Sequence, residues 1–180
     1  MQIKLENVRL SYPHLFKKHK SPKHPDSEPK YSAGFLIPKD GKEHKKVLDA
    51  INTVGKEKWG AKASGLITKY KMSSNTCCLK TEEMYPENEN MKGNVSLNAN
   101  SSIRPLVLDC DKSELDEDSG RPYGGCYVNA VLDIYIQEGE HSGIRCQLKG
   151  VQFVKDGEAF SSATPAKADD FDIVETEDLL

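Results

Sequence analysis

Residues 126–137, CYVNAVLDIYIQ, carry the clearest structural pattern in the chain, an alternation of side-chain type with a period of two. One face takes Val128, Ala130, Leu132, Ile134 and Ile136, and the other takes Tyr127, Asn129, Val131, Asp133 and Tyr135. A period of two is typical of a β-strand, because successive side chains point to opposite faces of the sheet. The stretch therefore predicts a long strand with one face in the core and the other partly in water.

The residues that follow predict the hairpin partner of this strand. Ile144, Cys146 and Leu148 alternate in the same way beyond a glycine-containing turn. The apolar phase then shifts after Gly150, to Val151. A glycine inside a strand together with such a shift indicates a bulge or a bend. We expect a long hairpin with a bulge or bend at Gly150.

The N-terminal third predicts two more strands and a helix. Residues 2–12 alternate with a one-residue change of phase near Asn7, which indicates a β-bulge. Residues 31–37 form a second strand that Pro38 ends. Asp40 and Glu43 then make a capping-box pattern, which begins a helix that runs to about Lys58. Helical spacing of apolar residues supports it, at Val47, Leu48, Ile51 and Val54.

The remaining stretches carry weaker patterns. Residues 17–30, KKHKSPKHPDSEPK, are rich in lysine and proline and have no apolar side chain to pack, so they predict a mobile basic loop. Residues 61–94 predict short strands at most. Residues 95–100 and 106–108 predict two further strands, and residues 109–120 predict an acidic loop.

These elements together favour a mainly β fold. The expected class is the OB-fold, a five-stranded, partly open barrel with one helix between strands, and a β-sandwich with the same strand count is the alternative. We expect residues 1–160 to form this domain and residues 161–180 to form an acidic, flexible C-terminal tail. Because the sequence has no apolar run at its start and none of membrane-spanning length, we expect a soluble, cytoplasmic protein.

The net charge of −3 conceals two parts of opposite sign. Residues 1–80 hold 17 Lys and Arg against 7 Asp and Glu, a net charge of +10. Residues 81–180 hold 8 against 21, a net charge of −13. Such a division suggests a body that binds a polyanion, joined to an acidic end.

Motifs of several enzyme classes are missing from the sequence. It contains no GxGxxG, phosphate loop, HExxH or GxSxG, and its cysteines form no CxxC pair, so we expect no catalytic residue, no metal and no cofactor. The acidic run that starts at Asp109 lacks the glycine and the bidentate glutamate of a calcium loop. One alternative function stays open, a metal-dependent nuclease or other replication enzyme that uses Asp109 and Asp111.

Cations and aromatic rings are interleaved along the chain. Proteins that bind single-stranded DNA need both, because lysine and arginine neutralise phosphates while exposed rings stack on unpaired bases of any sequence. We therefore predict binding of single-stranded DNA without strong sequence preference. Tyr70 and Tyr123, which lie next to lysine or glycine, are expected to be the most exposed rings. The candidate DNA-binding residues are Arg9, Tyr12, Phe16, Lys17, Lys18, Lys69, Tyr70, Lys71, Arg104, Arg121 and Tyr123.

The end of the chain combines acidic with apolar residues. The acids are Asp169, Asp170, Asp172, Glu175, Glu177 and Asp178, and the apolar residues include Phe171, Leu179 and Leu180. Two uses follow as hypotheses: the carboxylates compete with DNA for the basic groove, and the apolar residues recruit replication proteins. The alternative is a short final strand or helix that packs on the body.

Several short segments resemble, in order, a family of phage single-stranded DNA-binding proteins with an OB-fold, long catalogued only as a domain of unknown function. The segments are Val8–Phe16 (VRLSYPHLF), Lys30–Ala33, Phe35–Lys39, Lys56–Gly60, Arg104-Pro105, Gly124–Ala130 and Gly150–Glu158. The resemblance implies a role in phage DNA replication, recombination or repair in the host cytoplasm, with binding tuned by an acidic tail. The chain ends in Leu179-Leu180, whereas replication-type single-strand binders often end in an aromatic residue.

Overall fold

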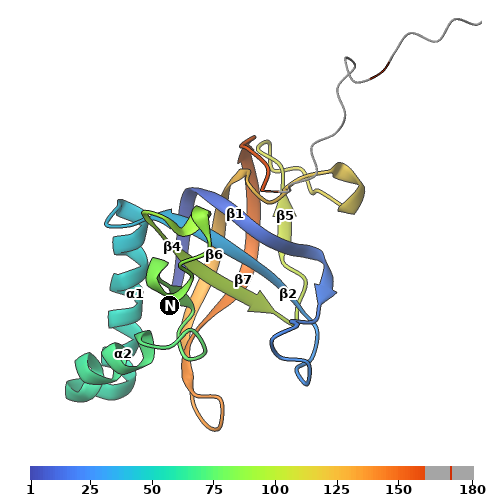
Figure 1. Ribbon diagram of the computed structural model, residues 1–180. Coiled ribbons are helices and arrows are strands. Elements are labelled where there is room, and N and C mark those ends of the chain that lie inside the picture. The colour runs from blue at the N-terminus through green and yellow to red at the C-terminus, as the bar shows by residue number, and fades with distance from the viewer. Residues whose placement is uncertain (161–170, 172–180) are drawn as a thin grey trace, which may run out of the picture.

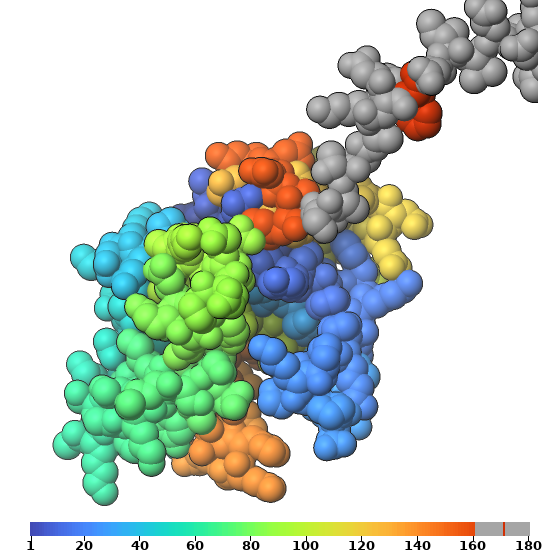
Figure 2. Space-filling model, in the orientation of Figure 1, coloured from blue at the N-terminus to red at the C-terminus, as the bar shows by residue number. Residues whose placement is uncertain are grey.

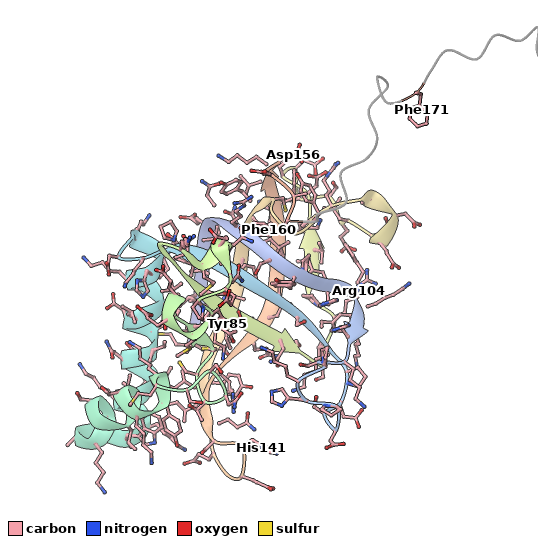
Figure 3. The ribbon with its side chains drawn as sticks, viewed as in Figure 1. Tyr85, Arg104, His141, Asp156, Phe160 and Phe171 are labelled. Carbon is pink, nitrogen blue, oxygen red and sulfur yellow. The ribbon has the colours of Figure 1, made fainter. Side chains whose placement is uncertain are left out.

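The computed structural model describes residues 1–160 and Phe171. The predicted acidic tail, Phe171 excepted, lies outside the described residues, so the tail and the domain boundary at residue 160 stay predictions. Phe171 itself is exposed (Figure 3). Over the described part of the chain, no helix is both long enough and apolar enough to cross a membrane.

Strands dominate the described chain, and two α-helices lie between the second and third strands. The elements are β1 (Gln2–His19), β2 (Lys30–Pro38), α1 (Lys42–Trp59), α2 (Ala63–Lys71), β3 (Leu79–Lys80), β4 (Asn94–Ser101), β5 (Leu106–Leu108), β6 (Tyr127–Gln137) and β7 (Gly143–Lys155). Short 3-10 helices cover Gly60–Lys62, Glu82–Met84, Glu89–Met91 and Glu117–Ser119.

Five of the strands close into a barrel (Figure 1). β1 pairs with β2 and β6, β2 pairs with β4, and β6 pairs with β7, all antiparallel. A parallel bridge between Asn100 of β4 and Gln147 of β7 closes the ring. The short strand β3 pairs with β4, and the short strand β5 pairs with β7. The predicted OB-fold is therefore confirmed, and the β-sandwich alternative is wrong because a closed ring leaves no second sheet.

Both predicted bulges are present and bend the strands around the barrel. The register of β1 against β6 shifts between Leu5 and Val8, where Asn7 has a φ of 52°. The register of β6 against β7 shifts where Val131 faces Gly150 and Leu132 faces Leu148. A bulge increases local twist, which a small closed barrel requires.

Helix α1 packs its apolar stripe on the barrel, as predicted from the helical spacing. Val47, Ala50 and Ile51 are fully or almost fully buried in the common core. The predicted capping box is wrong, because Gly41 is the N-cap and no side chain caps the helix. Glu43 instead accepts hydrogen bonds from the Glu6 backbone and the Lys46 ammonium.

Residues 61–94 contain the expected short strand, β3, and also helix α2, which was not expected. Only Ala63 and Ile67 of α2 are buried, so its apolar periodicity is too short to identify from sequence. It packs on α1 where Gly55 leaves room, since a Cβ there would lie 2.6 Å from the Ile67 Cδ1 atom. The close approach of the two helices depends on that glycine.

Strand β1 is also longer than predicted and corrects the start of the basic loop. It continues past Tyr12 to His19, whose partner is Lys30 of β2. The loop between the two strands therefore covers residues 20–29 rather than 17–30. Lys17 and Lys18 are held on a strand, where their positions are better defined than on a loop.

Candidate nucleic-acid interface

A groove crosses the outer faces of β1, β2 and β4. Its floor is made of small polar residues: a Cβ on Gly34 would lie 2.5 Å from the Ser11 Oγ and 3.3 Å from the Asn98 Oδ1. Loop 20–29 forms one wall, and residues 82–91 form the other. Figure 2 shows the hollow between these walls, with β1 and β2 in its depth. The two walls approach each other where the Lys23 Nζ lies 5.3 Å from the centre of the Tyr85 ring.

Tyr12 is the most prominent residue of this region. Its side chain is 76% exposed, and its φ is 44°. A left-handed conformation is costly for a bulky residue with a Cβ, and such strain concentrates at functional sites. The backbone turn at Tyr12 places an aromatic ring in solvent at the groove, where it is free to stack on a base.

Basic residues gather where β1 leads into loop 20–29. Lys17 and Lys18 are exposed there, and the Lys17 Nζ lies 3.0 Å from the Glu117 Oε1. The Arg104 guanidinium lies 5.8 Å from the centre of the Phe16 ring. Phe16 itself packs partly against the core. The structure therefore brings Tyr12, Phe16, Lys17, Lys18 and Arg104 together along β1 and its neighbours.

Four further residues belong to the same surface and were not among the candidates predicted from the sequence. Lys20, Lys23 and Lys30 belong to the basic stretch that was noted only as a loop, and all three are exposed. Tyr85 lies among glutamates in the least patterned part of the sequence, and only the fold brings it opposite Lys23. The lysine run was the available signal, and nothing local identifies Tyr85.

Arg9 is held by backbone carbonyls. Its Nε donates to the Gly125 oxygen at 3.0 Å and its Nη2 donates to the Glu158 oxygen at 2.6 Å. The guanidinium also lies 4.2 Å from the centre of the Phe160 ring. These contacts attach residues 156–160 to β1 near Asp156 and Phe160 (Figure 3). Arg9 therefore has a structural task in the free protein.

Arg121 and Tyr123 are engaged with carboxylates. Arg121 donates to Asp109, and this hydrogen bond, with one from the Cys110 backbone, holds the pKa of Asp109 below its usual value. Tyr123 donates to the Asp156 carboxylate at 2.7 Å, which raises the pKa of the phenol. Tyr123 is half-buried, so the expectation that it is among the most exposed rings is wrong.

Lys69, Tyr70 and Lys71 lie on α2, away from loop 20–29 (Figure 1). Tyr70 stacks on Trp59 with ring centres 5.4 Å apart, and its hydroxyl lies 3.3 Å from the Ser142 Oγ. Tyr70 is therefore half-buried, against the prediction that it is exposed. The structure does not bring these residues together with Tyr12.

Two histidines stack beside the groove, with His14 and His19 ring centres 4.0 Å apart and planes 5° from parallel. Partial burial lowers the pKa of His14, and the neighbouring His19 lowers it further. Both effects oppose a positive charge on His14. The His14 ring therefore adds flat aromatic surface near Lys17 and Lys18 more than it adds positive charge.

The carboxylates of the nuclease alternative are engaged with the protein itself. Asp109 pairs with Arg121, and Asp111 accepts hydrogen bonds from the backbone and hydroxyl of Ser113, which lower its pKa. Among the described residues, no three His, Cys, Asp or Glu side chains lie close enough together to hold a metal ion.

The family model described as "Enterobacter phage Enc34, ssDNA-binding protein" matches residues 1–180. The chain belongs to this family. Protein p50 of Acyrthosiphon pisum secondary endosymbiont phage 1 is 38% identical over 187 residues, which cover 100% of this chain and 99% of that protein.

Solved structures agree with this family assignment. The single-stranded DNA-binding protein of bacteriophage Enc34 in complex with ssDNA matches with a TM-score of 0.73 and 33% identity, over 89% of each chain. Its C-terminal truncation matches with a TM-score of 0.71 and 31% identity, over 88% of each chain. Bacteriophage T7 gp2.5 shares the fold, with a TM-score of 0.56 and 11% identity over 92% of this chain and 98% of that chain.

Proposed function

We propose that this chain is a single-stranded DNA-binding protein of a phage, a binding protein rather than an enzyme, which acts in the host cytoplasm during DNA replication, recombination or repair. The observation that carries the proposal is the groove over β1, β2 and β4, with the exposed ring of Tyr12 beside a cluster of lysines. Family membership supports it, because the Enc34 relative has been solved in complex with ssDNA.

The DNA-contacting surface in this proposal follows β1 and loop 20–29. Tyr12 stacks on a base, and Phe16 and Tyr85 add ring surface. The phosphate contacts come from Lys17, Lys18, Lys20, Lys23, Lys30 and Arg104. Lys17 pairs with Glu117 in the free protein, but both side chains are exposed, so this pair is weak enough to exchange for a phosphate. Arg9, Arg121 and Tyr123 support the fold beside this surface, because their polar groups are already paired. Lys69, Tyr70 and Lys71 form a separate basic patch on α2, which a longer DNA reaches only after leaving the groove.

The acidic tail acts on the same groove in this proposal. The described domain ends beside Tyr12: a Cβ on Gly124 would lie 3.9 Å from the Phe160 ring and 4.0 Å from the Tyr12 nitrogen. The Phe160 nitrogen donates to the Gly124 oxygen at 3.1 Å, which holds this end in place. Residues 161–180 thus begin next to the proposed DNA site, and six of the last twelve residues are acidic. We infer that these carboxylates compete with phosphates, and that the apolar residues recruit replication proteins.

A titration of a labelled oligonucleotide across a salt series tests both parts of this proposal. The full chain is expected to bind with an affinity that falls steeply as salt rises, because neutralised phosphates release counterions. A chain that lacks residues 169–180 is expected to bind several-fold more tightly, with the largest gain at low salt, where charges are least screened.

The matched control replaces the six tail acids by their amides and keeps the chain length. It is expected to behave like the truncated chain, since the charge is what competes. Absent or salt-insensitive binding would contradict the proposed function. Equal affinity of the full and truncated chains at every salt concentration would contradict competition by the tail.

A further inference from the structure

The two walls of the groove have opposite charge. Loop 20–29 and the strand ends beside it carry five lysines against two acids, Asp26 and Glu28, whereas residues 82–91 carry four glutamates and no lysine or arginine. The lysines are Lys17, Lys18, Lys20, Lys23 and Lys30, and the glutamates are Glu82, Glu83, Glu87 and Glu89. Figure 3 shows Tyr85 on the acidic wall and Arg104 on the other side of the groove. A uniform polyanion does not fit between such walls, because one wall repels it. A single strand does fit, since it has one charged edge, the phosphates, and one uncharged edge, the bases.

A cavity lies between Tyr12 and the acidic wall. Tyr12 lines one side and residues 84–89 line the other, and the cavity volume is about 480 Å³. The cavity is open to solvent rather than enclosed, and its volume leaves room for a nucleobase. Its lining offers the exposed Tyr12 ring, the Tyr85 residue and hydrogen-bonding groups from Glu87 and Asn88.

The glutamates of the wall differ in what they contact. Glu82 accepts a hydrogen bond from the Gly93 backbone, Glu83 lies 4.0 Å from Lys39, and Glu89 pairs with Lys92 at 2.9 Å. Within residues 1–160, none of the ion pairs includes Glu87. Its exposed carboxylate lines the cavity, where it repels a phosphate and accepts a hydrogen bond from an amino group.

We propose that this cavity binds one unpaired base of a single strand, an inference that rests on the proposed function. The base stacks on Tyr12, the phosphates lie toward the lysines of loop 20–29, and the base edge faces Glu87. At position 4 of the ring cytosine presents an amino donor and thymine a carbonyl acceptor, so a carboxylate that faces this position accepts a hydrogen bond from cytosine and is repelled by the thymine oxygen. Thymine keeps one donor on the same edge, its N3–H, which limits the difference in affinity. The cavity therefore selects cytosine over thymine, a modest base preference within a largely sequence-tolerant site.

The test compares dC and dT oligonucleotides of equal length on the full chain at neutral pH, by fluorescence polarisation. The measured quantity is the ratio of the Kd for dT to the Kd for dC. Glu87→Gln is expected to lower this ratio about fivefold, since a charge-assisted bond to the cytosine amine is lost and the glutamine amide also donates to thymine. Glu57→Gln, the same charge change on the exposed face of α1, is expected to leave the ratio unchanged.

The outcomes separate this inference from the proposed function. If both oligonucleotides bind and Glu87→Gln leaves the ratio as it was, the base-binding cavity is wrong while single-strand binding stands. An equal fall of the ratio in Glu57→Gln also overturns the cavity, since the effect is then one of net charge. If neither oligonucleotide binds, both the proposed function and the inference fail.

Discussion

Tyr12→Gly is expected to weaken binding of single-stranded DNA about tenfold while making the folded protein more stable. The affinity falls because a stacked ring contributes about 1–3 kcal/mol per base. The stability rises by up to about 1 kcal/mol, because glycine adopts the φ of 44° without strain and the 76% exposed ring has little burial to lose. Oligonucleotide titration measures the first effect, and urea unfolding measures the second.

Tyr12→Phe is the matched control for this substitution. It keeps the ring and the strained backbone, so both the affinity and the free energy of unfolding are expected to stay near those of the original chain. A Tyr12→Gly chain that binds DNA as tightly as the original would remove Tyr12 from the interface. A loss of stability larger than about 1 kcal/mol, which exceeds the backbone entropy that a glycine costs, would mean that the ring supports the fold.

Arg9→Lys is expected to lower the free energy of unfolding by about 2 kcal/mol, although it conserves the charge. The planar guanidinium donates to the Gly125 and Glu158 oxygens at once and covers the Phe160 ring, a geometry that an ammonium does not reproduce. The DNA affinity of the folded variant is expected to change by less than about threefold, because a residue bound to backbone carbonyls makes no phosphate contact to lose.

The control for Arg9 is Arg104→Lys, which changes an exposed arginine. Its free energy of unfolding is expected to stay within about 0.5 kcal/mol of the original, as is usual for surface positions. Equal stability of Arg9→Lys and the original chain would refute the attachment role. A large loss of affinity in folded Arg9→Lys would restore Arg9 to the DNA-contacting surface.

The fold could be predicted where its causes are local. The alternation in residues 126–137, the phase shift at Gly150 and the helical spacing from Val47 to Val54 each reflect one element that faces one core. Helix α2 was missed because two buried residues do not make a periodic pattern. The end of β1 was missed because its last residues, Lys17–His19, are exposed and carry no apolar alternation.

The candidate site was predictable in composition and not in arrangement. The basic run along residues 17–30 and the ring of Tyr12 were visible in the sequence. The pairing of Arg9 with carbonyls 116 and 149 positions away was not, because only the closed barrel brings those segments together. The position of Tyr85 opposite Lys23 could not be predicted either, for the same reason. Residue type indicates the chemistry that a side chain offers, whereas the fold determines whether that chemistry is already used.

Photo-cross-linking tests most directly whether the groove over β1, β2 and β4 holds the DNA. A single strand that contains iodo-deoxycytidine is irradiated with the full chain, and the attached peptides are identified by mass spectrometry. We predict cross-links at Tyr12, at Tyr85 and in the peptides that cover residues 16–31. The substitution Tyr12→Gly is expected to reduce the yield of these cross-links. Cross-links confined to α2 or to residues 109–120 would contradict this account.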